Sequence, residues 1–350
     1  MVPFLDLAAR HAGAAEAVER RVLEVLRSGH YVGGPVVAEA EAVAARWMGR
    51  TGAVGVGSGT DALMLALQAV GVTPGDEVIV PALTFFATAG AVGALGAVPV
   101  VVDVVDDGTI DPAAVVEALS PRTAAVVPVH LFGTRAARLD VPVPVVDDAA
   151  QAVGADPPAS HGVLTAVSAY PTKLWGAAGD AGFVVGDDAE LLDSVRRLGH
   201  HGQVGPHLHE RVGGAIGRNS RLDALQAAVL LGHAEELPAR IAHRRSLVGA
   251  YEALLPSWVR PLPRTEGSPA SPFVVQVAGR DEVVQALADA GVGCSVYYPR
   301  SLARQPALAG PHRPTPTADR LASEVLALPV HEGLTEEDVA QVCAVLGRCR

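Results

Sequence analysis

The stretch "GAVGVGSGTDALMLALQAVG", residues 52–71, decides the fold, because a run of small and β-branched residues passes directly into a helical pattern. Residues 52–58 predict a buried strand, and residues 60–71 predict the helix that follows it. Gly57 and Gly59 stand at the change and let the backbone turn tightly between the two elements. The stretch is therefore typical of a strand-to-helix unit in an α/β domain.

The same alternation continues toward the middle of the chain. Val-rich segments predict strands at residues 76–82, 98–104, 123–132 and 141–147. Helical patterns at residues 86–96 and 111–119 separate the first three of them. Continuous apolar strands separated by helices indicate a parallel sheet that is covered by helices on both faces.

The last third of the chain has a different order of elements. It predicts a long helical stretch at 221–254, a strand at 272–279, a helix at 281–291 and a final helix that begins after Thr335. This order suits a smaller α+β domain. We therefore predict a large domain over residues 1–240, which includes an N-terminal helical segment, and a small C-terminal domain over residues 241–350.

Composition restricts the classes of function. The net charge of −11 gives no reason to expect a nucleic acid or an anionic membrane as a partner. We expect neither a secretory signal nor a membrane span, because the N-terminus lacks a basic and apolar signal pattern and the uncharged run 85–102 is interrupted by Gly and Pro. Cys294, Cys343 and Cys349 have no metal-binding or redox spacing, which indicates reduced thiols in the cytoplasm. The low content of charged residues, 19%, indicates a further buried surface such as a subunit interface.

Lys173, in "SAYPTK" at residues 168–173, is the only lysine of the chain. Arginine can replace lysine wherever a surface charge is needed, but only lysine can lose its proton and add to a carbonyl as a Schiff base. A leftover lysine on a solvated face is the alternative interpretation. The small and apolar flanking residues favour the chemical one.

Two further features lie where parallel strands are expected to end. The backbone amides of Gly59, Thr60 and Asp61 would stand at a helix N-terminus, where a phosphate is favoured, although such turns also serve packing alone. Asp147 and Asp148 end another strand, where a carboxylate could hold a proton on a ring nitrogen or could simply cap the next segment. Phosphate cradle, ring-nitrogen carboxylate and Schiff-base lysine together are what pyridoxal phosphate (PLP) requires.

Motifs along nearly the whole chain resemble one known family. They are "VPFLDL", "GSGTDALMLAL", "GDEVIVPALTFFAT", "VPVVVDV", "PVHLFG", "VVDDAAQAVGA", "SAYPTK", "GDAGFVV", "NSRLDALQAAVL", "YYP" and "LPVHEGLTEEDV". The chain resembles the DegT/DnrJ-type (StrS-like) sugar aminotransferases, PLP enzymes of the aspartate-aminotransferase fold type I that act on nucleotide-linked keto sugars. The resemblance implies a large PLP-binding domain with a mainly parallel sheet of the seven-stranded type, a small C-terminal α+β domain, and a homodimer with shared active sites.

The resemblance also implies roles for the motif residues that touch the cofactor ring. Lys173 would form the Schiff base and later carry a proton between substrate and cofactor. Asp148 would pair with the pyridinium nitrogen, and Gln151 would hydrogen-bond the phenolic oxygen. Phe85 would stack on the ring; an ordinary core Phe is the alternative.

A second group of motif residues would bind the cofactor phosphate. Ser168 would do so together with Gly59, Thr60 and Asp61. Asn219 matches an asparagine that the family reaches across from the second subunit.

Residues near the substrate are expected from the same motifs. Tyr31, Tyr298 and His331 lie in motifs near the sugar, although single aromatics more often serve packing. The histidine-rich loop "HHGQVGPHLHE" at residues 200–210 has a poor spacing for metal ligands, so no metal is expected and His201 is placed at the site entrance.

Three departures from the family pattern have structural consequences. The segment 134–144 is too short and too rich in proline for the helix that relatives carry there, so a plain loop is expected. Arg218 and Ser220 replace aromatics at the substrate rim. Leu174 and Trp175 replace an asparagine and an apolar residue after the lysine.

The predicted reaction is transfer of an amino group from L-glutamate, or glutamine, to a dTDP-3-keto-6-deoxyhexose. The opening "VPFLDL" and the run "NSRLDALQAAVL" resemble the family branch that aminates the 3-keto carbon more than the 4-keto branch. A 4-keto sugar or an aminocyclitol aminotransferase, and a non-catalytic or regulatory relative, are the alternatives. A dehydratase of the same family is disfavoured, because those relatives carry histidine in place of this lysine.

Overall fold

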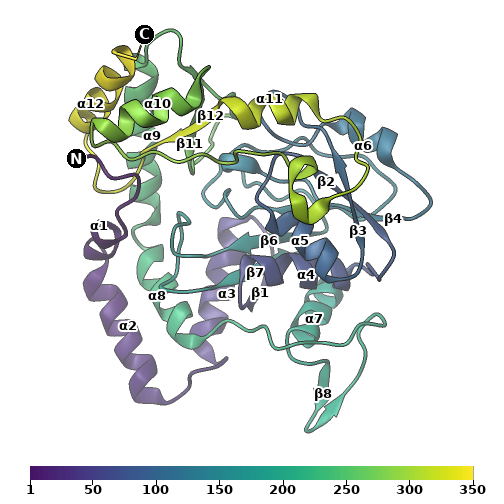
Figure 1. Cartoon of the computed structure of the whole chain (residues 1–350). Coiled ribbons are helices and arrows are strands. Elements are labelled where there is room, and N and C mark those ends of the chain that lie inside the picture. Colours follow the sequence, from purple (N-terminus) through teal and green to yellow (C-terminus); the bar gives the residue numbers. More distant parts are fainter. Residues whose placement is uncertain (350) are drawn as a thin grey trace.

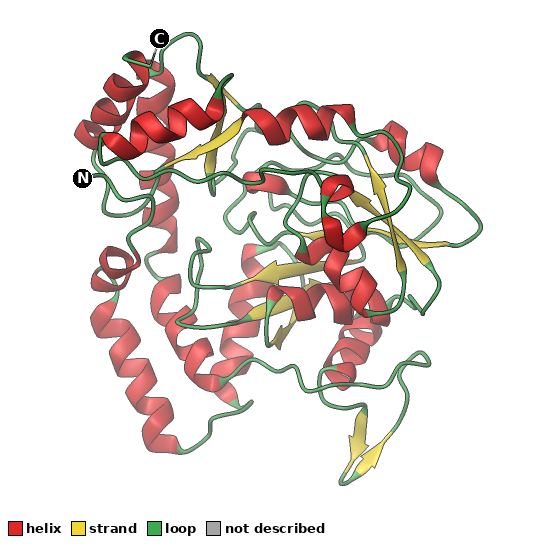
Figure 2. Cartoon of the chain, in the orientation of Figure 1, coloured by secondary structure: helices red, strands yellow, loops and turns green. Residues whose placement is uncertain are grey.

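A four-stranded sheet forms the centre of the computed structural model, which describes residues 1–349 (Figures 1 and 2). Its strands stand in the order β1 (Gly52–Val56), β7 (Gly182–Gly186), β6 (Leu164–Ser168) and β5 (Val146–Asp148). The strand β7 is antiparallel to both of its neighbours, whereas β5 and β6 are parallel.

A second, parallel sheet continues the first. It has the order β3 (Val98–Val102), β2 (Glu77–Pro81) and β4 (Thr123–Val126). Isolated parallel bridges join its β4 edge to the β5 edge of the first sheet, from Val126 to Val145 and from Val129 to Asp148. The predicted mainly parallel arrangement of seven strands is therefore confirmed, with β7 as its antiparallel member. Two predicted strands have the wrong bounds. The strand predicted at 123–132 is too long, because β4 ends at Val126, and the strand predicted at 141–147 starts too early, because β5 begins only at Val146.

Helices cover both faces of this sheet. Alternate residues of β7 point to opposite faces, so Val184 packs with the helix α4, while Phe183 and Val185 pack with α3 and α8. The helices of this half of the chain are α1 (Leu7–Ala12), α2 (Ala15–Ser28), α3 (Pro35–Trp47), α4 (Gly59–Ala69), α5 (Ala87–Ala94), α6 (Pro112–Ala118), η1 (Leu131–Gly133), α7 (Ala189–Leu198) and α8 (Ala224–Ala234). A short hairpin, β8 (Gln203–Gly205) with β9 (Leu208–His209), projects from the body at the lower right of Figure 1.

The C-terminal part has its own antiparallel sheet and its own apolar core. The sheet contains β10 (Arg260–Pro261), β11 (Phe273–Gln276) and β12 (Val325–Leu328) in that order. The helices of this part are α9 (Leu237–Leu254), α10 (Arg280–Asp289), η2 (Leu302–Arg304), η3 (Pro306–Leu308), α11 (Pro316–Glu324) and α12 (Glu336–Gly347). Thr335 begins α12 with a capping box that Asp338 completes. The N-terminus lies beside this part, where Val2 bridges Val292 (Figure 1).

The segments 134–145 and 221–254 can be compared with the secondary structure predicted for them. No helix forms between Thr134 and Val145, as the short and proline-rich sequence predicts. The helical stretch predicted at 221–254 is two helices, because α8 ends at Ala234 and α9 begins at Leu237. The helix α9 runs through residue 240, so the division into domains at 240/241 stays a prediction. Within residues 1–349, no helix is long and apolar enough to cross a membrane.

Candidate active site

A cavity of about 540 Å³ lies at the edge of the large sheet where its parallel strands end. In sheets of this kind, ligands bind at the carboxyl ends of the strands. Segments from both ends of the chain close the cavity, since Phe4 and Val330 belong to its wall. The predicted site residues that line it are Gly59, Thr60, Phe85, Asp148, Gln151, Ser168, Lys173 and Tyr298.

Lys173 lies in the turn that follows β6. The guanidinium of Arg10 donates hydrogen bonds to the carbonyl oxygens of Pro171 at 2.9 Å and of Lys173 at 2.6 Å. On the other side of the turn, the buried Trp175 donates from Nε1 to the carbonyl oxygen of Leu230 in α8 at 2.8 Å. The turn that carries the lysine is therefore held by α1 from one direction and by α8 from the other.

Burial and neighbouring charges shift the pKa values of Lys173 and Asp148, which both line the cavity. Desolvation lowers the pKa of Lys173, and the negative charge of Asp148 opposes this only in part. Burial raises the pKa of Asp148, against the lowering effects of the Ala150 amide, the Thr88 hydroxyl and the charge of Lys173. A lysine that loses its proton readily, next to a buried carboxyl group in a cavity, is typical of a functional site.

A threonine hydroxyl and a backbone amide hold the carboxylate of Asp148. Thr88, on α5, donates to Oδ2 of Asp148 at 2.9 Å, and its own hydroxyl lies 3.0 Å from that of Thr84. The backbone amide of Ala150 donates to Oδ1 at 3.1 Å. Hydrogen bonds therefore fix the orientation of this carboxylate toward the cavity.

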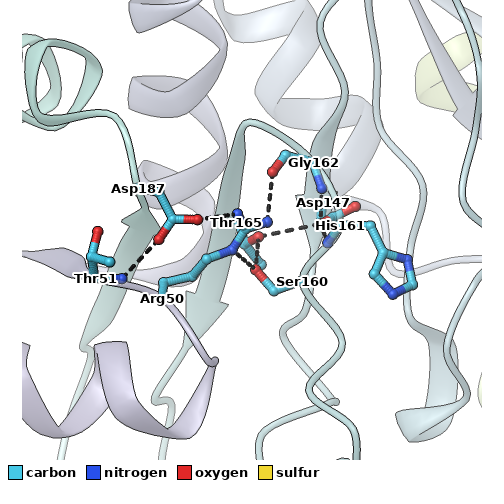
Figure 3. Close-up of polar contacts among 8 residues, drawn as sticks. All are labelled: Arg50, Thr51, Asp147, Ser160, His161, Gly162, Thr165 and Asp187. Atoms are coloured by element: carbon cyan, nitrogen blue, oxygen red, sulfur yellow. Dashed lines mark hydrogen bonds and ion pairs between the residues drawn. The ribbon is translucent and has the colours of Figure 1, made fainter.

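The preceding residue, Asp147, points to the other face of the strand, as neighbours in a strand do. It accepts hydrogen bonds from the amides of His161 and Gly162 and from the Thr165 hydroxyl (Figure 3). Its Oδ1 lies 3.6 Å from Nε2 of His130. Burial alone would raise the pKa of Asp147, but His130 and the two amides lower it below its usual value. Asp147 therefore ties the loop before β6 to β5 and does not line the cavity.

The predicted phosphate cradle is built on the N-terminus of α4. Ser58 is the N-cap, and its Oγ accepts the amide of Asp61 at 3.1 Å. A Cβ atom on Gly59 would lie 2.6 Å from the Cβ of Ser168, so the close approach of these two elements requires glycine. Thr60 and Ser168 face the cavity, whereas Asp61 lies outside its wall.

Gln151, Tyr298 and Phe85 stand together on one wall. Gln151 donates from Nε2 to the Tyr298 hydroxyl at 3.3 Å and accepts the amide of Phe132 at 2.7 Å. The rings of Phe85 and Tyr298 are 5.9 Å apart and tilted, and Phe85 is 59% exposed. An exposed aromatic ring in a cavity wall offers a flat surface to a ligand.

Besides Asp61, four predicted residues lie outside the cavity. Asn219 and Tyr31 are exposed, and Asn219 accepts a hydrogen bond from Arg221 at 3.2 Å. His201 is exposed in the loop after α7, with a positive φ of 58°. His331 is buried; its Nε2 lies 3.0 Å from the Pro3 carbonyl oxygen, and its Nδ1 accepts the amide of Gly333, so both ring nitrogens are used within the chain.

Comparison with known proteins agrees with this geometry. Residues 14–347 match the DegT/DnrJ/EryC1/StrS aminotransferase family. The chain belongs to this family. It is 36% identical to the UDP-2-acetamido-2-deoxy-3-oxo-D-glucuronate aminotransferase of Pseudomonas aeruginosa, over 99% of each chain. It is 37% identical to the dTDP-3-amino-3,4,6-trideoxy-alpha-D-glucose transaminase of Streptomyces venezuelae, over 97% of this chain and 94% of that one.

A solved relative shows the cofactor class. The structure of NtdA from Bacillus subtilis with bound cofactor PMP superimposes with a TM-score of 0.89 at 29% identity, over 99% of this chain and 85% of that one. The protein is therefore a PLP-dependent sugar aminotransferase of this family. Within residues 1–349, no group of His, Cys, Asp and Glu side chains has the arrangement of a metal site.

The residues of this aminotransferase fit PLP. The cavity holds one lysine with a lowered pKa, one buried carboxylate and a helix N-terminus that only glycine allows so close to Ser168. When bound, PLP supplies an electron sink that stabilises a carbanion at the substrate carbon. Three of its polar groups, the aldehyde, the ring nitrogen and the phosphate, have these matching groups in the wall, and Gln151 lines the same cavity for the phenolic oxygen.

The departures from the family pattern have local explanations. Ser220 is buried, and its Oγ accepts the amide of Gly57 at the end of β1 at 3.0 Å. Arg218 donates to Gln68 on α4 at 3.0 Å. Neither side chain lines the cavity, so both substitutions for aromatics support the fold of this loop.

Several site residues escaped the sequence interpretation. The predicted helix at 86–96 includes Thr88, but its role beside Asp148 was not predicted. Its spacing of four residues from Thr84 was the available signal, because side chains four positions apart can meet on one face of a helical turn. Ser58 was readable as an N-cap, being a serine directly before a helix. Arg10 gave no local signal, because its partners lie 161 and 163 residues away.

Replacing Arg10 by methionine is expected to lower the free energy of unfolding by about 3 kcal/mol, because Glu332 loses a buried cationic partner and two carbonyl groups lose their donor. Denaturant unfolding measures this. Arg21→Met, which removes an exposed ion pair with Glu39, is the matched control with a loss below about 1 kcal/mol. Equal losses in both variants would show that the Arg10 contacts do not hold the lysine turn.

Proposed function

We propose that this protein transfers an amino group from L-glutamate to carbon 3 of a dTDP-linked 3-keto-6-deoxyhexose. The observation that carries the proposal is that both relatives described above name carbon 3 as the keto or amino position. One of them acts on a dTDP-linked trideoxy sugar by its name. The apolar cavity wall, with Leu5, Phe85, Val129 and Leu131, supports a deoxygenated hexose as the ligand.

Lys173 is proposed as the catalytic residue. As a neutral amine, Lys173 would hold the cofactor through the cofactor's carbonyl carbon, and its Nζ could carry a proton at the substrate carbon. Its lowered pKa keeps a larger fraction of the amine neutral. The carboxylate of Asp148 would hold the positive charge of the ring nitrogen, which strengthens the electron sink.

Tyr298 and Gln151 are proposed as positioning residues at the rim of the ring. Burial raises the pKa of Tyr298, so its hydroxyl stays neutral and can donate. Gln151 already accepts the amide of Phe132, which leaves its amide nitrogen free to turn from Tyr298 to a ligand oxygen. A non-catalytic relative would have no use for a half-buried Lys173 and a buried Asp148 in one cavity.

The reverse direction tests the substrate. The enzyme is supplied with dTDP-3-amino- or dTDP-4-amino-6-deoxyhexose together with 2-oxoglutarate, and glutamate formation is followed. We expect turnover of the 3-amino sugar. Turnover of the 4-amino sugar alone would contradict the position on the ring, and turnover of an aminocyclitol instead of both would place the protein in the cyclitol branch.

We further propose a homodimer in which Asn219 reaches the cofactor phosphate of the neighbouring subunit. Asn219 is exposed and lies outside its own cavity, which suits a role across an interface. Exposed apolar side chains such as Leu23, Leu26 and Ile216 offer surface for that interface.

Mixed dimers of Lys173→Ala and Asn219→Ala subunits are therefore expected to regain activity, because each mixed dimer contains one intact site. The rescued activity is measured after mixing, with mixed dimers quantified by native mass spectrometry. Dimers that form but stay inactive would place Asn219 in the site of its own subunit or outside the site.

A further inference from the structure

Three buried arginines surround a single, largely buried carboxylate beside the cavity. Arg10, Arg240 and Arg244 are 4%, 6% and 3% exposed. Glu332 is their anionic partner: it lies 3.4 Å from Arg10, and its charge also acts on Arg240 and Arg244. These four side chains come from α1, from α9 and from the segment between β12 and α12. We call them the arginine cluster.

The arginine cluster carries more positive than negative charge. Three guanidinium groups face one carboxylate, and buried ions without a partner are strongly unfavourable. The hydrogen bonds of the cluster are incomplete as well. Nη1 of Arg240, Nε of Arg244 and both carboxylate oxygens of Glu332 have no hydrogen-bond partner, and Nε of Arg10 has only the ion pair with Glu332 at 3.4 Å. Burial lowers the pKa of Arg244 to about 10, so its guanidinium still keeps its charge at neutral pH. The cluster therefore has room for a further anion.

Only one member of the cluster can reach a ligand. Arg10 is occupied by the carbonyl groups of the lysine turn, and Arg240 donates to the Arg10 carbonyl oxygen at 3.2 Å. Arg244 lines the cavity that Lys173 also lines, and one of its Nη atoms is tied to the Ala270 carbonyl oxygen at 3.2 Å. Its Nε is buried and has no acceptor among the described residues.

We propose that Arg244 binds a carboxylate group of the amino donor, L-glutamate, and of its product 2-oxoglutarate. This inference rests on the proposed aminotransferase reaction with glutamate. A planar guanidinium binds a carboxylate through two parallel hydrogen bonds, which fixes the orientation of the donor relative to Lys173. The sugar ring of a 6-deoxyhexose has no such group, so Arg244 serves the donor half of the reaction.

A carboxylate site at Arg244 would separate the binding of the amino donor from the binding of the keto sugar. In the proposed reaction, donor and keto sugar occupy the same cavity in turn, and they resemble each other only at the carbon that carries the amino or keto group. A carboxylate brings the missing negative charge to the arginine cluster, and its departure as 2-oxoglutarate removes that charge again. The diphosphate of the nucleotide is the other anion that could bind here, and the experiment separates the two.

The test measures dissociation constants by calorimetry on the PLP-loaded enzyme, with the unreactive dicarboxylate glutarate and with dTDP. Arg244→Gln is expected to weaken glutarate binding on the order of 100-fold, since a buried charged partner is lost, and to leave dTDP binding unchanged. Arg244→Lys is expected to weaken it on the order of tenfold, because an ammonium group cannot form both hydrogen bonds. Arg245→Gln, the exposed neighbour on α9, is the control with no change.

The two half-reactions give an independent readout. In Arg244→Gln, conversion of the cofactor by L-glutamate is expected to lose on the order of 100-fold in kcat/KM, whereas conversion by the amino sugar is retained. Unchanged glutarate affinity in either Arg244 variant, or loss of dTDP affinity with glutarate retained, would overturn the proposal. If the wild type reacts with L-glutamate but with neither amino sugar, the sugar assignment fails while the glutarate result still decides the role of Arg244.

Discussion

Lys173→Arg is expected to lose turnover by at least about 10⁴-fold, because arginine cannot supply a neutral amine for attack on a carbonyl. The variant keeps a cation of similar length in the same turn. The contacts that fix this turn go to its backbone, from Arg10, and to Trp175, so the substitution leaves them in place. Reverse transamination with 2-oxoglutarate measures the loss.

The thermal midpoint of Lys173→Arg provides the control. Its value is expected to stay close to that of the wild type, since the substitution breaks no hydrogen bond of the fold. A folded and active Lys173→Arg enzyme would contradict the assignment of Lys173 as the nucleophile. A variant that has lost both activity and cooperative unfolding would instead point to a structural role for the side chain.

Asp148→Asn is expected to lower turnover by about 10³-fold, because a neutral amide cannot hold the positive charge on the cofactor ring. The amide has nearly the shape of the carboxylate, and its oxygen can still accept the hydrogen bond of Thr88. The loss therefore reports on charge and not on packing. Activity, and the midpoint of cofactor release on dilution, are measured together.

Asp147→Asn is the matched control on the same strand. It is expected to leave the chemistry in place and to lower the free energy of unfolding by about 2 kcal/mol at neutral pH, because it weakens a buried hydrogen-bonded network. The folded pKa of Asp147 is lowered, so its contribution is present above the unfolded pKa and is lost as pH falls through the folded pKa. The stability difference between this variant and the wild type should therefore shrink in acid. A larger loss of activity in Asp147→Asn than in Asp148→Asn would reverse the roles of the two carboxylates.

The contrast between these two aspartates shows what the sequence could and could not predict. Two adjacent acids at the end of a Val-rich strand indicate a functional edge, but the composition of the stretch does not say which one faces the cavity. Only the position of the helix α5, which brings Thr88 to Asp148, and of the loop before β6, which encloses Asp147, decides it. The resemblance to the family identified Asp148 correctly, because the second acid of the motif "VVDDAAQ" is the one that faces the cofactor in the family.

Local features were predictable because their physics is local. The strand-to-helix turn at Gly59 and the capped start of α12 at Thr335 follow from residues within a few positions of each other. The loop at 134–144 followed from its length and its prolines. Strand ends were less predictable, since β5 is only as long as its pairing with β6 allows.

Contacts between segments that lie far apart in the chain could not be predicted from the sequence. His331 lies in a family motif, yet both of its ring nitrogens are engaged by Pro3 and Gly333, one of them 328 residues away. Arg10, Arg244 and Glu332 meet only because α1 and the C-terminal part lie on the same side of the molecule (Figure 1). No pattern along the chain indicates that such residues meet.

Reduction of the purified enzyme with borohydride, followed by peptide mass spectrometry, tests the central claim most directly. If PLP is bound in the cavity to the lysine beside Asp148, reduction fixes a phosphopyridoxyl group on the peptide that contains Lys173, and the cofactor colour disappears. Because Lys173 is the only lysine of the chain, the α-amino group is the one other amine that could carry the label. A label on the N-terminal peptide, or none on a yellow and active enzyme, would contradict this account.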